Sequence, residues 1–415
     1  MSIESISLLK SQYLKTNEDS AMIYHQLGKI PHKRHTQFRR PDGELYQEHL
    51  FGAEGFHGVS SLMYHHNPPT KTFKVEKGKE VKIEKWDEGM LRHHHLRTAK
   101  IEEGGDPVMG RKVLLYNNDV QIGAVRPTEP MDYFYKNGEH DELLFIHEGE
   151  GYVHTMFGKL EFGWGDYIYI PRGTIYQVVF ETEKNRMLTI DSTGPVDIPD
   201  RYLSDKGQFL ENSPFCERDI RRPEGPIFVN KQGEFEVRIK KQGRYTSYWY
   251  EHHPFDVVGW DGYLYPWIFN IKDFEPITGR VHQPPPVHQT FEGNNYVVCS
   301  FCPRKYDYHP QSIPAPYAHS NVDSDEVLYY VKGDFMSRKG VEEASITQHP
   351  GGIPHGPHPG KYEGSIGKEA TDEYAVMIDT FHPLHLTTEA KKLDDESYPF
   401  SWNEDKEKPK IEAEE

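Results

Sequence analysis

The sequence predicts an all-β protein with few short helices, and two observations carry this prediction. Gly and Pro occur along the whole chain, at 35 and 30 residues, and they interrupt long helices while favouring turns. Between them stand short runs rich in β-branched and aromatic residues, spaced as in β-barrels and β-sandwiches. The 21 Phe, 26 Tyr and 6 Trp supply bulky side chains for a core, and the length of 415 residues predicts two or three domains.

The first part of the chain predicts a polar arm followed by a barrel. Residues 1–60 are polar and mixed, and they form the predicted N-terminal arm and extension. Residues 61–194 form the predicted first barrel, in which two apolar runs flank Asn117-Asn118-Asp119 and predict a hairpin. Gly or Pro separates the strands expected next, at residues 143–146, 151–155, 159–162, 166–170 and 176–180.

The second part predicts a connection, another barrel and a tail. Residues 195–265 are rich in Pro, Arg and Asp, and we expect a connecting segment there. A β-rich stretch that ends near residue 379 predicts a second barrel within residues 266–390. Residues 391–415 form the predicted charged tail, and we expect its part after Asn403 to be disordered and to contribute little to function.

The composition excludes several classes of protein. With 48 Lys and Arg against 65 Asp and Glu, the net charge of −17 argues against binding to nucleic acid, which demands a basic face. No run of about 18 apolar residues predicts a membrane span, and the N-terminus lacks the pattern of a secretory signal. Cys216, Cys299 and Cys302 are the three cysteines, the last two expected as packed thiols, which predicts a reducing, cytoplasmic location. The 24 His raise the question of a metal site.

An internal repeat relates the two β-rich stretches. Glu142 precedes Gly149 by seven residues, as Glu326 precedes Gly333, and each pair is followed by the pattern P-x-G-x-x-(His or Tyr). The second copy ends this pattern at His355 and places His319 seven residues before its Glu, whereas the first copy has tyrosines, Tyr176 and Tyr135. These patterns resemble the two motifs of the cupin barrel. The resemblance implies a bicupin of two β-barrel or jelly-roll domains, the first without metal and the second with a metal site.

The second copy offers two imidazoles and one carboxylate as metal ligands. His319 and Glu326 differ by seven positions, so they cannot share one face of a strand and must lie on separate strands or across a turn. Two His and one carboxylate on one face of an octahedron leave three positions open, as in non-haem Fe(II) oxygenases. Open positions allow an organic substrate and O₂ to bind side by side.

Longer segments sharpen this resemblance to one family. Tyr317-Ala318-His319, the run His349-Pro-Gly-Gly-Ile-Pro-His355-Gly-Pro and the upstream Phe255-Asp-Val-Val-Gly-Trp-Asp-Gly-Tyr are similar to homogentisate 1,2-dioxygenase. The resemblance implies an extradiol-type ring cleavage, homogentisate plus O₂ to 4-maleylacetoacetate, in tyrosine and phenylalanine catabolism. It implies Fe(2+) as the cofactor and a homo-oligomer whose partners are a small aromatic substrate and O₂. The implied roles are metal ligands for His319, Glu326 and His355, catalytic acid or base for His282, and substrate contacts for His349, Phe335 and His355.

Other candidate residues are weighed separately. His282 lies in the family's active-site position at Gln-Pro-Pro-Pro, whereas His288 after that turn is expected to be a loop residue. An anionic substrate requires a local cation, for which Arg280 and Arg304 are the candidates. The triplet His93-His94-His95 is not expected to bind one metal ion, because consecutive strand residues point to opposite faces, and its role stays open.

Two other functions remain open. Phe335 stands where better-known family members carry a Tyr, which favours a cupin dioxygenase of another hydroquinone such as gentisate. The second alternative is a non-catalytic or isomerase-like bicupin, in which the metal is structural or absent.

Overall fold

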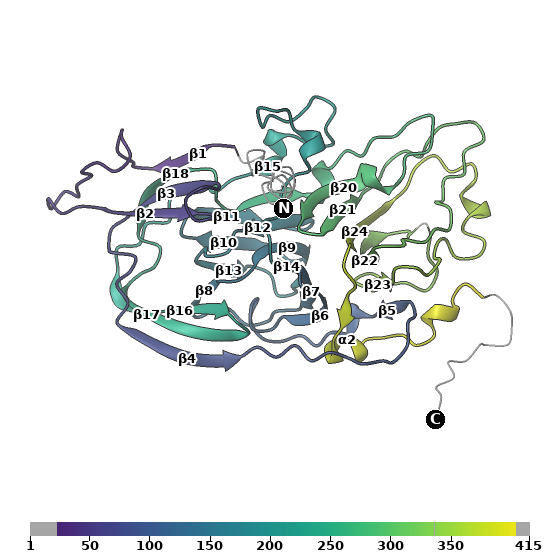
Figure 1. Ribbon diagram of the computed structural model, residues 1–415, viewed down its shortest axis with the longest axis horizontal. Helices are drawn as coiled ribbons and strands as arrows, with labels where there is room; N and C mark the ends of the chain where they lie inside the picture. The colour runs from purple at the N-terminus through teal and green to yellow at the C-terminus, as the bar shows by residue number, and fades with distance from the viewer. Residues whose placement is uncertain (1–22, 336, 404–415) are drawn as a thin grey trace, which may run out of the picture.

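The computed structural model describes residues 23–335 and 337–403 (Figure 1). Two sheets of matching strand order form the centres of two halves, which lie side by side. In the first half the order is β15 (Ile220–Arg221), β19 (Trp267–Asn270), β12 (Asp166–Ile170), β9 (Asp141–Glu148), β14 (Arg186–Ser192), β7 (Val120–Val125), β6 (Lys112–Tyr116) and β25 (His385–Leu386). In the second half it is β5 (His94–Leu96), β23 (Ile346–His349), β22 (Asp325–Gly333), β24 (Glu373–Thr380), β21 (Tyr296–Phe301) and β20 (Gln289–Gly293).

Two further sheets complete the first half. One closes its barrel and continues outward in the order β11 (Gly158–Phe162), β10 (Gly151–Thr155), β13 (Tyr176–Phe180), β8 (Phe134–Asn137), β16 (Gln232–Lys241), β17 (Arg244–His252) and β4 (Lys74–Glu80). The other contains β1 (His25–Gly28), β18 (Val257–Gly262), β3 (Ser60–His65) and β2 (Gln47–Gly52).

Helices in the described part of the chain are short. The α-helix is α2 (Thr388–Lys391), and single 3₁₀ turns are η1 (Thr98–Lys100), η2 (Asp200–Tyr202), η3 (Glu217–Asp219), η4 (Ile271–Asp273), η5 (Pro285–His288), η6 (Glu363–Ser365) and η7 (Tyr398–Phe400). The all-β prediction is therefore confirmed. Across residues 23–335 and 337–403, no helix has the length and apolar character needed to cross a membrane.

The repeat found in the sequence has the same backbone geometry in both halves. Tyr135 and Tyr176 face each other as bridge partners in the first half, and His319 and His355 do so in the second. The glycines that end the long central strands of the two copies both adopt a positive φ, 103° at Gly149 and 107° at Gly333. A side chain at such a φ is strained, so Gly is required at this turn. Most predicted strands of the first barrel also match, including β10, β12 and β13 at the expected residues.

Two segments differ from their predicted character, although the domain boundaries themselves stay a prediction. The polar arm contributes β1 and β2, and the supposed connecting segment contributes the long hairpin β16–β17 together with β18. The run 234–240, Glu-Phe-Glu-Val-Arg-Ile-Lys, alternates charged with apolar residues, as half-buried strands do, but the Pro-rich flanks obscured it. In the charged tail, residues 391–403 are ordered around η7, and residues 404–415 lie outside the described part.

The two halves exchange short strands. β5 from the N-terminal half of the sequence pairs with β23, and β25 near the C-terminus pairs with β6 (Figure 1). Between the central sheets, Nδ1 of His147 lies 2.6 Å from the hydroxyl of Tyr329, and both side chains are buried. Cys299 and Cys302 are buried free thiols on and just after β21, as expected.

Candidate metal centre

The backbone brings His319, Glu326 and His355 together at one end of the second sheet. His319 and His355 exchange two backbone hydrogen bonds of 2.8 and 2.9 Å, so their side chains stand side by side. Glu326 is the second residue of β22, after the turn that follows His319. The turn after β23 passes through Gly352, whose φ of 85° reverses the chain and returns His355 beside Glu326. The predicted separation of His319 and Glu326 across a turn is thus what the structure shows.

The side chains converge as a metal-binding group would require. One ligand atom from each of the three residues lies within 4.8 Å of the others. Nε2 of His319 is 3.8 Å and Nε2 of His355 is 3.5 Å from the Glu326 carboxylate. Nε2 of His355 is buried and has no hydrogen-bond partner among the described residues. A buried nitrogen lone pair without a partner, beside a second imidazole and a carboxylate, fits a divalent metal ion such as Fe(II).

The electrostatics of the group favour an ionised Glu326. Burial by itself would raise the pKa of its carboxyl group, but the neighbouring imidazoles of His319, His349 and His355 hold this pKa well below the ordinary value. Asp379 on β24 lies directly across from Glu326, and its Oδ1 is buried without a partner in the described chain. Burial and the neighbouring Glu326 raise the pKa of Asp379 to about 8. The sequence pattern gave no reason to single out Asp379.

His349 lies behind Glu326 and does not line the cavity beside the group. Its Nδ1 donates a 2.7 Å hydrogen bond to Oε1 of Glu326, and its ring stacks on His355 at 4.5 Å. Burial lowers the pKa of His349 to about 3, so the ring is neutral and its Nε2 accepts the hydrogen bond of 3.0 Å from the Tyr398 hydroxyl. With both nitrogens engaged, His349 orients Glu326; the predicted substrate contact would need a rearrangement.

The three consecutive histidines have three different surroundings. His93 is buried against His349, with ring centroids 5.2 Å apart, and its Nε2 lies 3.2 Å from the carbonyl oxygen of Pro354. His94 lies between two acids, Glu88 and Asp394, at 3.1 Å from each. His95 hydrogen-bonds the Ser345 hydroxyl at 2.8 Å. The triplet therefore does not converge on one point, in agreement with the sequence argument, but His93 packs against the metal-centre group.

The first part of the charged tail, residues 391–403, covers the same group. Tyr398 is buried against His349, and the Trp402 ring lies 5.3 Å from that of His93. The Trp402 indole N–H donates a 3.0 Å hydrogen bond to the carbonyl oxygen of Gly356, the residue after His355. Sequence reasoning missed this role because the segment is short, charged at its flanks and far along the chain from its contacts.

A small cavity of about 110 Å³ opens beside His319 and Glu326. Its walls include the predicted His282, Phe335 and Arg304, whereas Arg280 lies at a neighbouring surface hollow. His282 is 43% exposed at its side chain, and its Nδ1 is 3.2 Å from Asp307. Apolar and aromatic side chains form much of the remaining wall, namely Phe301, Leu328, Tyr330, Ala375 and Met377.

Two further residues of this cavity were not expected from the sequence. Arg338 is 7% exposed, lines the cavity, donates to the carbonyl oxygen of Gly356 and keeps an Nε–H without a partner in the described chain. His288, predicted to be an ordinary loop residue, is buried in the same wall with its ring 4.4 Å from Phe301. Burial lowers the pKa of His288 to about 3, so its ring is neutral.

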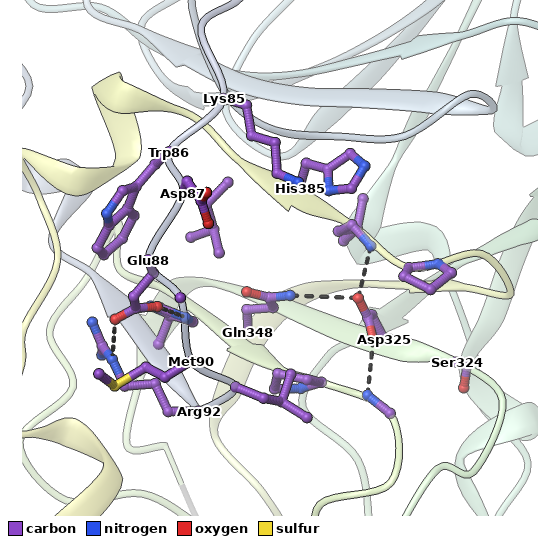
Figure 2. Close-up of a pocket in the computed structure, with 18 of the residues that line it drawn as sticks. Lys85, Trp86, Asp87, Glu88, Met90, Arg92, Ser324, Asp325, Gln348 and His385 are labelled. Carbon is purple, nitrogen blue, oxygen red and sulfur yellow. Dashed lines mark hydrogen bonds and ion pairs between the residues drawn. The ribbon is translucent and has the colours of Figure 1, made fainter. Parts of the chain in front are cut away.

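A larger cavity, of about 800 Å³, lies on the opposite face of β22 and β23 (Figure 2). Alternation along these strands places Asp325 and Gln348 there, each one position from Glu326 and His349. Figure 2 shows the Gln348 amide nitrogen directed at Asp325 and its oxygen directed away from it. Despite its size, this cavity is not lined by His319, Glu326 or His355. The chemistry of these three residues belongs to the smaller cavity of about 110 Å³.

Comparisons with known proteins place the chain among relatives. The family profile described as homogentisate 1,2-dioxygenase N-terminal matches residues 107–271. A Saccharolobus solfataricus protein named "Putative dioxygenase SSO1533" is 41% identical over 384 residues, covering 92% of this chain and 99% of that protein. Homogentisate 1,2-dioxygenase of Legionella pneumophila (strain Lens) is 27% identical over 274 residues, covering 62% of this chain and 64% of that protein. The match thus spans less than two thirds of that dioxygenase.

Solved structures show weaker likeness. A cupin 2 conserved barrel domain protein from Leptotrichia buccalis has a TM-score of 0.33 at 10% identity, covering 73% of this chain and all of that chain. An oxalate decarboxylase of Bacillus subtilis has a TM-score of 0.29 at 12% identity, covering 78% of this chain and 81% of that one. The fold is therefore argued from the strand order given above. The full-length relative and the family profile together show that this chain belongs to the homogentisate 1,2-dioxygenase family.

Proposed function

We propose that the protein is a ring-cleaving dioxygenase that converts homogentisate and O₂ to 4-maleylacetoacetate, with Fe(II) held by His319, Glu326 and His355. One observation carries this proposal: two imidazoles and a carboxylate converge beside a cavity walled by aromatic groups and a buried arginine. Bound Fe(II) would supply the redox chemistry between O₂ and a hydroquinone, with open coordination positions for both. Both oxygen atoms enter the ring-opened product.

The remaining side chains have roles that follow from their positions. Arg338 and Arg304 place positive charge in the cavity wall, where the substrate carboxylate would bind. Phe335 and Met377 give an apolar surface for the ring and exclude water. His282 lies at the cavity mouth with Nδ1 facing Asp307, an arrangement in which the other ring nitrogen would accept the proton of a substrate hydroxyl.

Oxygen uptake tests the proposal directly. The protein is purified anaerobically under reducing conditions, loaded with Fe(II), and given homogentisate and gentisate in parallel. We expect uptake of one O₂ per homogentisate and formation of the ring-opened acid. No uptake with homogentisate would refute the proposed substrate, and an iron content below about a tenth of an equivalent after loading would favour a non-catalytic bicupin.

Phe335 supports a second candidate within the same class of enzyme. Its apolar ring, 8% exposed and 4.7 Å from Tyr330, offers no hydroxyl for orienting a substrate group. A smaller hydroquinone such as gentisate, which lacks the methylene group of homogentisate, would be accepted in such a wall. Faster uptake with gentisate than with homogentisate would select this candidate.

A matched pair of variants tests the metal ligands. His355→Ala removes the unpartnered imidazole, and we expect loss of iron and of turnover. Tyr176→Phe changes the residue at the equivalent position of the first half, where its hydroxyl donates to Glu142 at 2.9 Å, and we expect iron content to stay unchanged. Equal loss of iron in both variants would contradict the assignment of the metal to the second half.

A further inference from the structure

The two halves carry polar rows at equivalent positions of their sheets, but the rows are displaced by one strand. In the second half the row runs across β23, β22, β24 and β21 as His349, Glu326, Asp379 and Val297. In the first half the equivalent strands β12, β9, β14 and β7 carry Ile170, Glu142, Asp191 and Gln121. The first half has thus lost the polar group at one end of the row and gained one at the other.

Internal cations occupy the first half's row. Arg111 forms an ion pair with Glu142 and donates a 3.1 Å hydrogen bond to the Tyr176 hydroxyl. Lys240 from β16 donates a 2.8 Å hydrogen bond to Oδ2 of Asp191, and both residues are buried. Glu142 therefore has partners at both of its oxygens. At the other end of the row, Oδ1 of Asp191 lies 3.8 Å from Nη1 of Arg111 in an ion pair but accepts no hydrogen bond from the described residues, and Oε1 of Gln121 accepts none either.

Two acceptor atoms at that end lack a hydrogen-bond donor in the described part of the chain. Oδ1 of Asp191 and Oε1 of Gln121 are buried and accept no hydrogen bond from the described residues, and the two residues lie directly opposite each other on β14 and β7. Asp191 is 5% exposed. Leaving such groups unsatisfied costs on the order of 1–3 kcal/mol each, so a donor is expected to reach them. Both residues line a cavity of about 580 Å³ at the mouth of the first barrel.

The cavity wall is suited to a neutral molecule with several hydroxyl groups. Tyr135 and Tyr245 contribute two aromatic rings, 6.4 Å apart, and Thr189 contributes another hydroxyl near the row. The charges of the wall nearly cancel, since five basic and four acidic side chains line it, while Glu142 lies behind Arg111. The basic ones are Lys79, Lys82, Arg111, Lys112 and Lys240, and the acidic ones are Glu80, Glu84, Asp191 and Glu389. An anion or a cation would meet little net attraction there.

We propose that the first barrel binds a neutral polyhydroxylated molecule of about monosaccharide size. Its hydroxyls donate to Asp191 and Gln121 and form a hydrogen bond with the Tyr245 hydroxyl, while its carbon skeleton packs on the tyrosine rings. The site is separate from the candidate metal centre and does not depend on the proposed oxygenase activity. Phenolic and aliphatic hydroxyls share the required donor chemistry, but the balanced charge and the number of polar atoms in the wall favour the polyol.

Binding to the full-length, iron-loaded protein tests the site. Saturation-transfer NMR and calorimetry are run with D-glucose, D-xylose and myo-inositol, and with citrate, phosphate and hydroquinone for comparison. We expect at least one of the three polyols to bind with a Kd of about 1 mM or tighter, and the other probes to bind more weakly. Absence of binding by all three polyols, or tighter binding of citrate, phosphate or hydroquinone, would overturn the proposal.

Variants locate the bound molecule. Gln121→Leu removes one acceptor and Tyr245→Phe removes a hydroxyl, and each should weaken polyol binding at least about fivefold, the loss expected for one hydrogen bond. Tyr248→Phe, on the opposite face of β17, is the matched control and should bind normally. His355→Ala should also bind normally, because the site is independent of the metal ligands. If Gln121→Leu does not fold, the polyol affinity of Tyr245→Phe decides the test. Equal polyol affinity in Tyr245→Phe and the parent protein would refute binding in this cavity.

Discussion

At the scale of the residue, the candidate metal centre depends on the hydrogen bond that His349 donates to Glu326. A carboxylate that is free to rotate binds a metal less tightly than one held in a fixed orientation. Because His349 is fully buried and engaged at both nitrogens, it fixes Glu326 from behind. We expect His349→Gln to lower Fe(II) affinity about 10- to 100-fold, measured by competition with a chelator. His309→Gln, at an exposed position, is the control, and unchanged affinity in His349→Gln would contradict the positioning role.

The position of Arg338 leads to a second prediction, which concerns how the substrate carboxylate is bound. A buried guanidinium facing a carboxylate contributes about 1.5–3 kcal/mol, which corresponds to roughly 10- to 100-fold in kcat/KM. Arg338→Met should cause this loss for homogentisate and a much smaller loss for methylhydroquinone, which lacks the carboxylate. Steady-state oxygen uptake with both substrates gives the comparison. A similar loss for both would mean that Arg338 acts only through its bond to the carbonyl oxygen of Gly356.

At the scale of the element, the segment around η7 is the least expected part of the site. Tyr398 and Trp402 cover His349 and His93, so this segment forms a wall of the metal centre. Tyr398→Phe would leave Nε2 of His349 buried without a donor, at a cost of about 1–3 kcal/mol. We expect lower Fe(II) affinity and a lower midpoint of thermal unfolding in this variant. Ending the chain after residue 403 should change neither the Fe(II) affinity nor the midpoint of thermal unfolding. Ending it after residue 396 should lower both. Equal behaviour of the two truncated proteins would contradict the role of this segment.

The central strands and the His–Glu group could be predicted because local patterns encode them. Gly333 and Gly352 mark turns that require a positive φ, and the same patterns recur at Gly149 and Gly173, so the register of the two halves was visible. No local pattern records that His93 and Tyr398 pack on His349, because both residues lie far from it in the sequence, Tyr398 at a separation of 49 positions. The same limit applies to Arg338, whose role comes from the loop that folds over the cavity. The hairpin of β16 and β17 was missed because Pro-rich flanks concealed the alternation of β16, and β17 has no clear alternation.

At the scale of the whole molecule, several imidazoles are buried in the neutral form where elements meet. Burial lowers the pKa of His147 to about 3 and the pKa values of His49 and His253 to about 4, against 6.5 for an ordinary His. The unfolded chain therefore binds more protons than the folded one between these values. Stability from these groups is complete above pH 6.5 and is lost as the pH falls toward 4. Asp197 acts in the opposite direction, since burial raises its pKa to about 7.

The three imidazoles together outweigh Asp197, so we expect the free energy of unfolding to fall between pH 6.5 and pH 4.5, as measured by urea denaturation at each pH. His147 tests the origin of this slope, because it joins the two halves through Tyr329. His147→Gln retains a hydrogen-bonding group but cannot take up a proton, so it should remove up to about 1.4 kcal/mol per pH unit from the slope. His385→Gln, exposed on β25, serves as the control and should leave the slope as it is in the parent. A slope in His147→Gln as steep as that of the parent would show that acid destabilises the protein elsewhere than at the junction of its two halves.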